Sequence, residues 1–217
     1  MRTNIIIGFL CIAGAVINVI TNIFASQFMF LPLYMDTIWT IAVTLLGGPV
    51  WGCITGILTN FIGHTVNFWG YEGYLFVLCN IATALLTWMF CRLFPDKINF
   101  KPIITNSFSS APAKSRYLDE VMNKVFVLSL LSFSLCLAMS ILGGLITFFI
   151  EFTRSGVSIQ NPASAPTMFY SEMPFLAREI LSRIPINLID RLLSAFAGFG
   201  IAFLLSKVLF KGFKKTN

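Results

Sequence analysis

The 217-residue chain is 57% hydrophobic and only 11% charged, with a mean hydropathy of +0.83. A soluble domain carries about 25% charged and about 45–50% apolar residues, so this composition excludes an ordinary water-soluble domain. One helical span needs about 20 apolar residues, which leaves room for five or six spans and no soluble catalytic domain. We therefore expect an all-α integral membrane protein, a bundle of about six transmembrane helices forming a single domain over residues 1–217.

Apolar runs in chain order predict spans at about 4–25, 35–47, 49–66, 74–93, 122–150 and 185–210. The first run resembles a signal peptide, but its length and its two asparagines, Asn18 and Asn22, favour a retained span. Runs two and three meet at Gly47-Gly48-Pro49, where glycine permits a tight turn and proline suits the first turn of a helix. Residues 94–121 are predicted to form a cytoplasmic loop, and 152–184 an outer loop with a short interfacial helix near its end.

Basic residues are unevenly distributed around these spans. The amino end, the region of the 94–121 loop and the tail from Lys207 hold eleven Lys and Arg residues, whereas the opposite side holds four. Cytoplasmic segments of membrane proteins carry this excess, so we predict a multi-pass protein of the bacterial cell membrane with both termini cytoplasmic. The net charge of +6 is then a topology signal that also attracts anionic lipid, and no nucleic-acid partner is expected.

The sequence predicts neither a cofactor nor an enzyme. Its five cysteines have unrelated spacings and form no metal-binding or redox motif. Walker A, GxSxG and HExxH sequences are absent, as is a paired acidic motif for phosphoryl transfer. If the protein moves a solute, the energy must come from a partner or from a gradient.

The third run carries a stripe of small and polar residues. Gly52, Gly56, Asn60 and His64 recur every four residues and therefore share one helix face, which continues toward Asn67. Glycines on such a face allow a neighbouring helix to approach closely. The polar end of the stripe has two interpretations, hydrogen bonding to another helix or contact with a ligand.

Further polar residues occur near the ends of the other runs. Asp36 opens the second run, where it can cap a helix or meet a ligand. Ionisable residues bordering a span are costly and suggest function, although Asp190 can also form a structural ion pair with Arg191 or Arg183. Asn80, within the fourth run, needs a polar partner. The predicted substrate-binding residues are Asn60, His64, Asn67, Glu72, Asn80, Glu151, Arg154, Asn187, Asp190 and Arg191.

Three segments carry a resemblance to a known family. They are Asp36-Thr-Ile-Trp-Thr40, the series Gly48-Pro49, Gly52, Gly56 and Asn60, and Ile184-Pro-Ile-Asn-Leu-Ile-Asp-Arg191. With about six spans in about 200 residues, the chain resembles the substrate-binding S components of energy-coupling factor (ECF) vitamin transporters. The last segment is similar to the start of the last helix in several S components.

The resemblance implies a binding subunit without enzymatic activity that captures a vitamin-like solute from the outer face. Its partners would be a transmembrane T subunit and a pair of ATPases, and it would topple in the membrane when coupled to them. Many S components present a small-xxx-small face on the first helix, and Cys11-xxx-Ala15 is the nearest equivalent in this chain. In such a site, Asn and His would hydrogen-bond a heterocycle, Arg would neutralise a carboxylate or phosphate, and Asp or Glu would meet a cationic ring.

Two other functions agree with the same residues. In a membrane sensing or scaffold module, the polar stripe would only pack helices. A stand-alone facilitator or an enzyme of lipid metabolism would use the polar residues without a partner. The residue types alone permit nearly every B vitamin as ligand, as well as a nucleobase, a metal chelate or a short peptide.

Overall fold

The computed structural model describes residues 2–28, 33–67, 71–98, 113–155 and 173–211, and all regular secondary structure in these ranges is helical. The elements are α1 (Arg2–Ile23), a π-helical turn η1 (Phe24–Phe28), α2 (Ile38–Gly47), α3 (Pro49–Asn67), a 3-10 helix η2 (Tyr71–Phe76), α4 (Val77–Leu93), α5 (Pro95–Ile98), α6 (Ala113–Ser155) and α7 (Phe175–Lys211). The prediction of an all-helical chain is confirmed.

Within the described residues, four segments are long and apolar enough to cross a membrane: Asn4–Gln27, Gly73–Leu93, Leu118–Thr153 and Phe175–Val208. Large apolar side chains on their outer faces are exposed, such as Phe9, Phe126 and Val208. In lipid such exposure carries no penalty, because the acyl chains are as apolar as these side chains. The chain is therefore an all-helical protein with several helices suited to span a membrane.

The count of six spans is not confirmed, because α2 is a short core helix. Its ten residues are about 15 Å long, roughly half of a ~30 Å hydrocarbon core. It contacts α1, α3, α4 and α7 and buries residues on several sides, including Ile41, Ala42 and Val43. A helix that is apolar all round is expected in such a central position. α3 has 19 residues but is not one of the four strongly apolar helices.

The predicted turn between runs two and three lies at Gly48. Its φ of 89° is in the left-handed region that favours glycine, and its N–H bonds the carbonyl oxygen of Thr44. Pro49 then opens α3, where proline lacks only an N–H that the first helical turn cannot use.

The last two long helices extend into the predicted loops. α6 begins at Ala113 and α7 at Phe175, so residues 113–121 and 175–184 are helical rather than loop, and α5 lies in the other part of the 94–121 segment. Pro185 lies inside α7 instead of at its start. Membrane helices tolerate such a proline because neighbouring groups satisfy the carbonyl that it leaves free.

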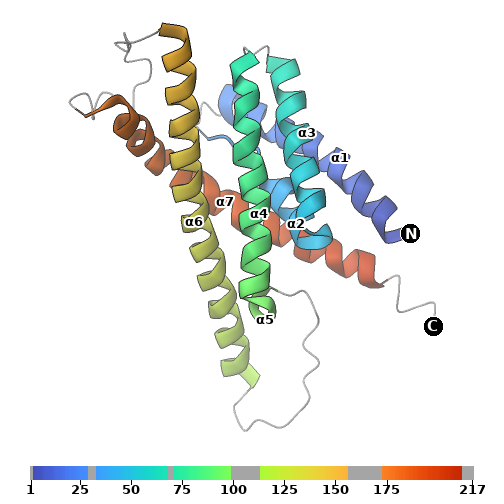
Figure 1. Ribbon diagram of the computed structural model, residues 1–217. Coiled ribbons are helices and arrows are strands. Elements are labelled where there is room, and N and C mark those ends of the chain that lie inside the picture. Colours follow the sequence, from blue (N-terminus) through green and yellow to red (C-terminus); the bar gives the residue numbers. More distant parts are fainter. Residues whose placement is uncertain (1, 29–32, 68–70, 99–112, 156–172, 212–217) are drawn as a thin grey trace.

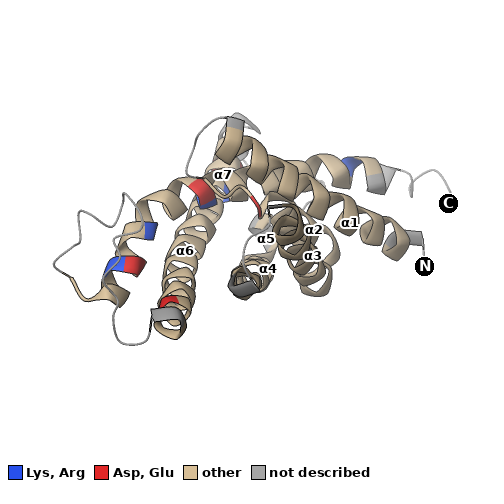
Figure 2. Ribbon diagram, turned by 90° about the horizontal axis from the view of Figure 1, so that it is seen from above, with Lys and Arg blue, Asp and Glu red and all other residues tan. Residues whose placement is uncertain are grey.

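The helices cross one another at marked angles. In Figure 1, α3, α4 and α6 stand side by side, and α1 and α7 run obliquely past them with α2 between. The start of α1 and the end of α7 lie on the same side of the molecule in both ribbon views. α2 and α3 contain no Lys, Arg, Asp or Glu, and Figure 2 draws them tan throughout.

Glycines allow the central helices to approach closely, as the sequence predicted for α3. A Cβ atom on Gly56 would lie 2.9 Å from Cβ of Asn80 in α4, and one on Gly52 would lie 3.1 Å from Cβ of Ala84. On α7, a Cβ at Gly198 would lie 2.7 Å from the carbonyl oxygen of Ile38 at the start of α2. A backbone atom cannot move aside as a flexible side chain does.

Gly198→Ala is therefore expected to destabilise the protein by about 1–3 kcal/mol, the usual cost of overpacking a core. Gly200→Ala is the matched control on the same helix, because a Cβ there has nothing within 4 Å. It should be neutral or stabilise the helix by up to about 1 kcal/mol. Detergent-induced unfolding followed by circular dichroism measures both, and equal effects would contradict the tight α2–α7 packing.

Candidate functional site

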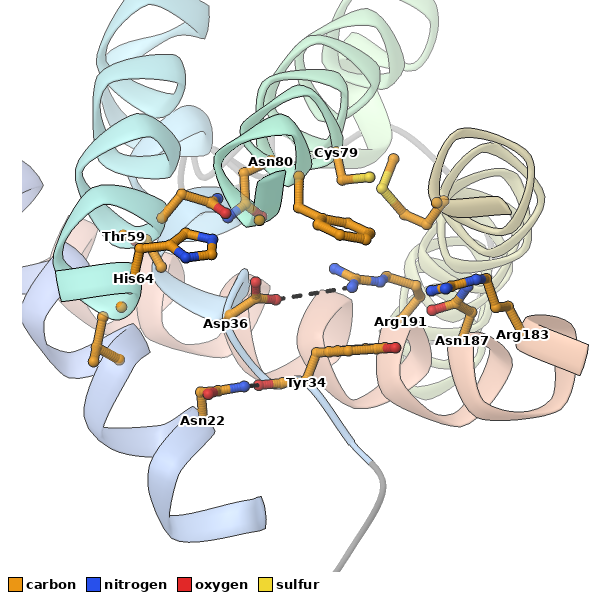
Figure 3. Close-up of a pocket in the computed structure, with 17 residues that line it drawn as sticks. Asn22, Tyr34, Asp36, Thr59, His64, Cys79, Asn80, Arg183, Asn187 and Arg191 are labelled. Carbon is orange, nitrogen blue, oxygen red and sulfur yellow. Dashed lines mark hydrogen bonds and ion pairs between the residues drawn. The ribbon is translucent and has the colours of Figure 1, made fainter. Parts of the chain in front are cut away.

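A cavity of about 220 Å³ lies between the helices at the end of the bundle where α3 ends and α4 begins. Its walls come from α1, the segment before α2, α3, η2, α4, α6 and α7. Figure 3 shows the lining side chains around a common space. The polar members, apart from the thiol of Cys79, are Asn22, Tyr34, Asp36, Thr59, Asn60, His64, Asn80, Arg183, Asn187 and Arg191.

Arg191 is the centre of an ion network at the floor of this cavity. Its Nη2 atom lies 3.0 Å from Oδ2 of Asp190 and 3.8 Å from Oδ1 of Asp36. Nη1 donates a 2.6 Å hydrogen bond to Oγ1 of Thr37. Arg191 is buried and Asp190 has no exposed surface. One guanidinium thus binds α7 to the segment that precedes α2.

Asp190 also fixes the backbone of that segment. Its Oδ1 accepts a 2.8 Å hydrogen bond from the N–H of Met35, whose φ of 46° is unusual for a residue other than glycine. The following residue, Asp36, turns toward Arg191 (Figure 3). The alternative that Asp36 caps α2 is wrong, because α2 begins at Ile38 with Thr37 as its N-cap. Asp36 lies in the cavity wall instead.

Asn18, a fully buried residue of α1, caps the start of α2 instead. Its Oδ1 accepts a 2.9 Å hydrogen bond from the N–H of Trp39 in the first turn of α2, where backbone donors have no partner within the helix. Its Nδ2 donates to Oγ1 of Thr40 and of Thr59, at 3.3 and 3.2 Å. Asn18 therefore joins α1, α2 and α3 beside the cavity and fixes Thr59 in its wall.

Aromatic rings form the side of the cavity near α3 and η2. The buried ring of His64 lies 4.6 Å from that of Tyr74, centroid to centroid, tilted by 40°. A Cβ atom on Gly73 would overlap the His64 ring, so glycine is required for this approach. Phe76 also lines the cavity, with the guanidinium carbon of Arg183 6.0 Å from its ring centroid.

Direct hydrogen bonds join α6 and α7 where these helices form the cavity wall. Nη2 of Arg183 donates to Oγ1 of Thr147 at 2.6 Å and lies 3.7 Å from Oε2 of Glu179. Nδ2 of Asn187 donates to Oγ of Ser140 at 2.9 Å. These polar side chains on α7 are thus held by neighbours on α6 or on α7 itself.

Several polar atoms of the cavity wall lack a hydrogen bond among the residues described. They include Nδ2 of Asn80, a residue that is 2% exposed, Oδ1 of Asp36, which has a 3.8 Å ion pair to Arg191, and Nε of both Arg183 and Arg191. A buried polar atom without a partner costs about 1–3 kcal/mol. Such atoms therefore indicate where a ligand or an ordered water binds.

The structure brings half of the predicted site residues to this cavity. Those that line it are Asn60, His64, Asn80, Asn187 and Arg191. Asp190 lies behind the wall, in the ion pair with Arg191 that the sequence offered as its alternative role. Glu151 is half-buried in α6 and is not part of the lining. The side chains of Asn67, Glu72 and Arg154 fall outside the described residues.

Five polar lining residues were absent from the predicted set: Asn22, Tyr34, Asp36, Thr59 and Arg183. Asp36 and Arg183 carried a usable signal, because both are ionisable residues that border apolar runs. Tyr34 and Thr59 carried none, because only the crossing of the helices brings them to the cavity.

No protein family, curated protein or solved structure matches the chain. The fold and the site therefore describe an all-helical protein in which apolar helices of membrane-spanning length surround a small, polar-lined cavity.

Proposed function

We propose that this protein is the membrane-embedded, substrate-binding subunit of an ECF-type importer and captures a small vitamin-like solute in the cavity between α1, α3, α4, α6 and α7. The observation that carries the proposal is the cavity itself. Polar groups inside an apolar bundle are expensive, so a cluster of them around an open space is expected to serve a ligand.

The size of the cavity agrees with a small solute. At about 220 Å³ it is below the range of about 300–1,000 Å³ that is typical for drug-sized ligands. Its wall combines aromatic rings with a few convergent polar groups, which is the usual composition of a small-molecule site. We therefore expect a solute with one ring system and few polar substituents.

The direction of capture rests on the distribution of charge. The positive-inside asymmetry predicts that the end of the bundle with the cavity faces outward. The chain contains no nucleotide-binding motif, which supports its dependence on a T subunit and ATPases for energy.

Uptake of pooled, isotope-labelled B vitamins into proteoliposomes tests this function. We expect accumulation only when the protein is reconstituted together with an ECF module, a T subunit with its ATPases, and ATP is supplied. Liposomes with the module alone are the control. Downhill uptake by this protein without the module would contradict the proposal and favour the stand-alone facilitator.

A further inference from the structure

The charges of the described residues in the cavity wall do not sum to zero. Three charged side chains among these residues line the cavity: Asp36, Arg183 and Arg191. Each arginine has an acidic partner behind the wall, Glu179 for Arg183 and Asp190 for Arg191. The three carboxylates of this network, Asp36, Glu179 and Asp190, therefore meet two guanidinium groups, which leaves one negative charge in excess.

The geometry around Arg191 assigns its charge mainly to Asp190. Nη2 lies 0.8 Å closer to the Asp190 carboxylate than to that of Asp36 (3.0 against 3.8 Å). Asp190 is fully buried and also accepts the Met35 N–H, so it cannot turn away from this position. The side chain of Asp36 is 27% exposed, and its Oδ1 accepts no hydrogen bond in the part of the chain that the structure describes.

The amide of Asn80 borders the same space. Its Nδ2 is buried on α4, interacts with the side chain of Asp36 and makes no hydrogen bond of regular geometry with the described groups. Figure 3 shows Asn80, His64 and Asp36 around one region of the cavity. The rings of Phe76 and His64 also line it, and aromatic faces attract cations.

We propose that the cavity selects a small solute with one positive charge, such as a protonated nitrogen heterocycle or an amidinium. Its N–H group donates to Oδ1 of Asp36, its ring packs against the aromatic side, and an acceptor on the solute receives the Nδ2 hydrogen of Asn80. This inference rests on the proposed solute-binding function and adds the charge class of the solute. Nε of Arg183 and Nε of Arg191 also lack a hydrogen-bond acceptor among the described residues, so preferential binding of an anion is the competing outcome of the test.

Three probes of nearly the same shape and different charge test the proposal: benzamidinium, benzamide and benzoate. Equilibrium dialysis against the full-length protein in lipid nanodiscs, with empty nanodiscs subtracted, measures each dissociation constant at neutral pH. Because charge-assisted hydrogen bonds are the stronger ones, we expect benzamidinium to bind about tenfold or more tightly than benzoate.

Substitutions test whether the preference for the cation depends on Asp36. Asp36→Asn should abolish the preference for the cation while helicity and the elution volume stay unchanged. Asp190→Asn should reduce it as well, because Arg191 then pairs with Asp36. Asp119→Asn, which removes an exposed carboxylate of α6 remote from the cavity lining, is the matched control and should leave the preference intact.

The outcomes separate the two proposals. Tighter binding of benzoate or benzamide, or a cation preference that survives Asp36→Asn, would overturn the charge inference and leave solute binding intact. Failure of the folded protein to bind any of the three probes at millimolar concentration would count against both.

Discussion

Replacement of Arg191 by methionine is expected to destabilise the protein by about 3–5 kcal/mol, the usual cost of removing one partner of a buried ion pair. Methionine keeps much of the side-chain volume but removes the cation that lies 3.0 Å from the fully buried carboxylate of Asp190. It also removes the donor to Thr37. The midpoint of SDS-induced unfolding, followed by circular dichroism, measures the change.

The double variant Asp190→Asn/Arg191→Met tests the cause. Asparagine has no charge to leave unpaired, and its Oδ1 can still accept the Met35 N–H, so a large part of the lost stability should return. A double variant that is no more stable than Arg191→Met would show that the loss comes from packing. Wild-type stability of Arg191→Met itself would contradict the ion network.

Gly63→Leu is expected to weaken solute binding at least about 100-fold, equivalent to ~2.7 kcal/mol, because the new side chain fills the cavity. Gly63 lines the cavity, and a Cβ there would meet only Cγ2 of Val19, at an ordinary contact distance of 3.7 Å. The change should therefore block the site without unfolding α3. Equilibrium dialysis with pooled, labelled B vitamins measures the loss.

Gly200→Leu provides the matched control for this experiment. Gly200 also has open space around a Cβ atom, but it does not line the cavity. The control should bind as the wild type does. Equal binding by Gly63→Leu and the wild type would mean that the solute binds elsewhere.

The sequence predicted the class of fold because lipid solubility depends on composition and on the length of apolar runs. It did not decide the role of α2, because an apolar run of about 13 residues can be a short span or a buried core helix. The choice depends on how many neighbours surround the run, and α2 has four helices around it. The long helices α6 and α7 continue into polar sequence, because a helix can extend beyond the hydrocarbon core into water. Hydropathy therefore underestimates the length of both helices.

The candidate site was predictable only in part. Asn60, His64, Asn80, Asn187 and Arg191 stand out in an apolar sequence as costly polar residues, and all line the cavity. Their partners could not be inferred from spacing. Arg191 bonds Thr37 across 154 residues, and Asn18 supplies the capping oxygen for a helix that begins 20 residues later. These contacts follow from helix crossing angles, which hydropathy does not encode.

Native mass spectrometry of the protein released from membranes tests most directly whether the cavity holds a solute. We predict one small molecule bound per chain in the wild type and in Gly200→Leu, and none in Gly63→Leu. A folded wild-type protein that carries no small molecule, even after incubation with a metabolite extract, would contradict the account.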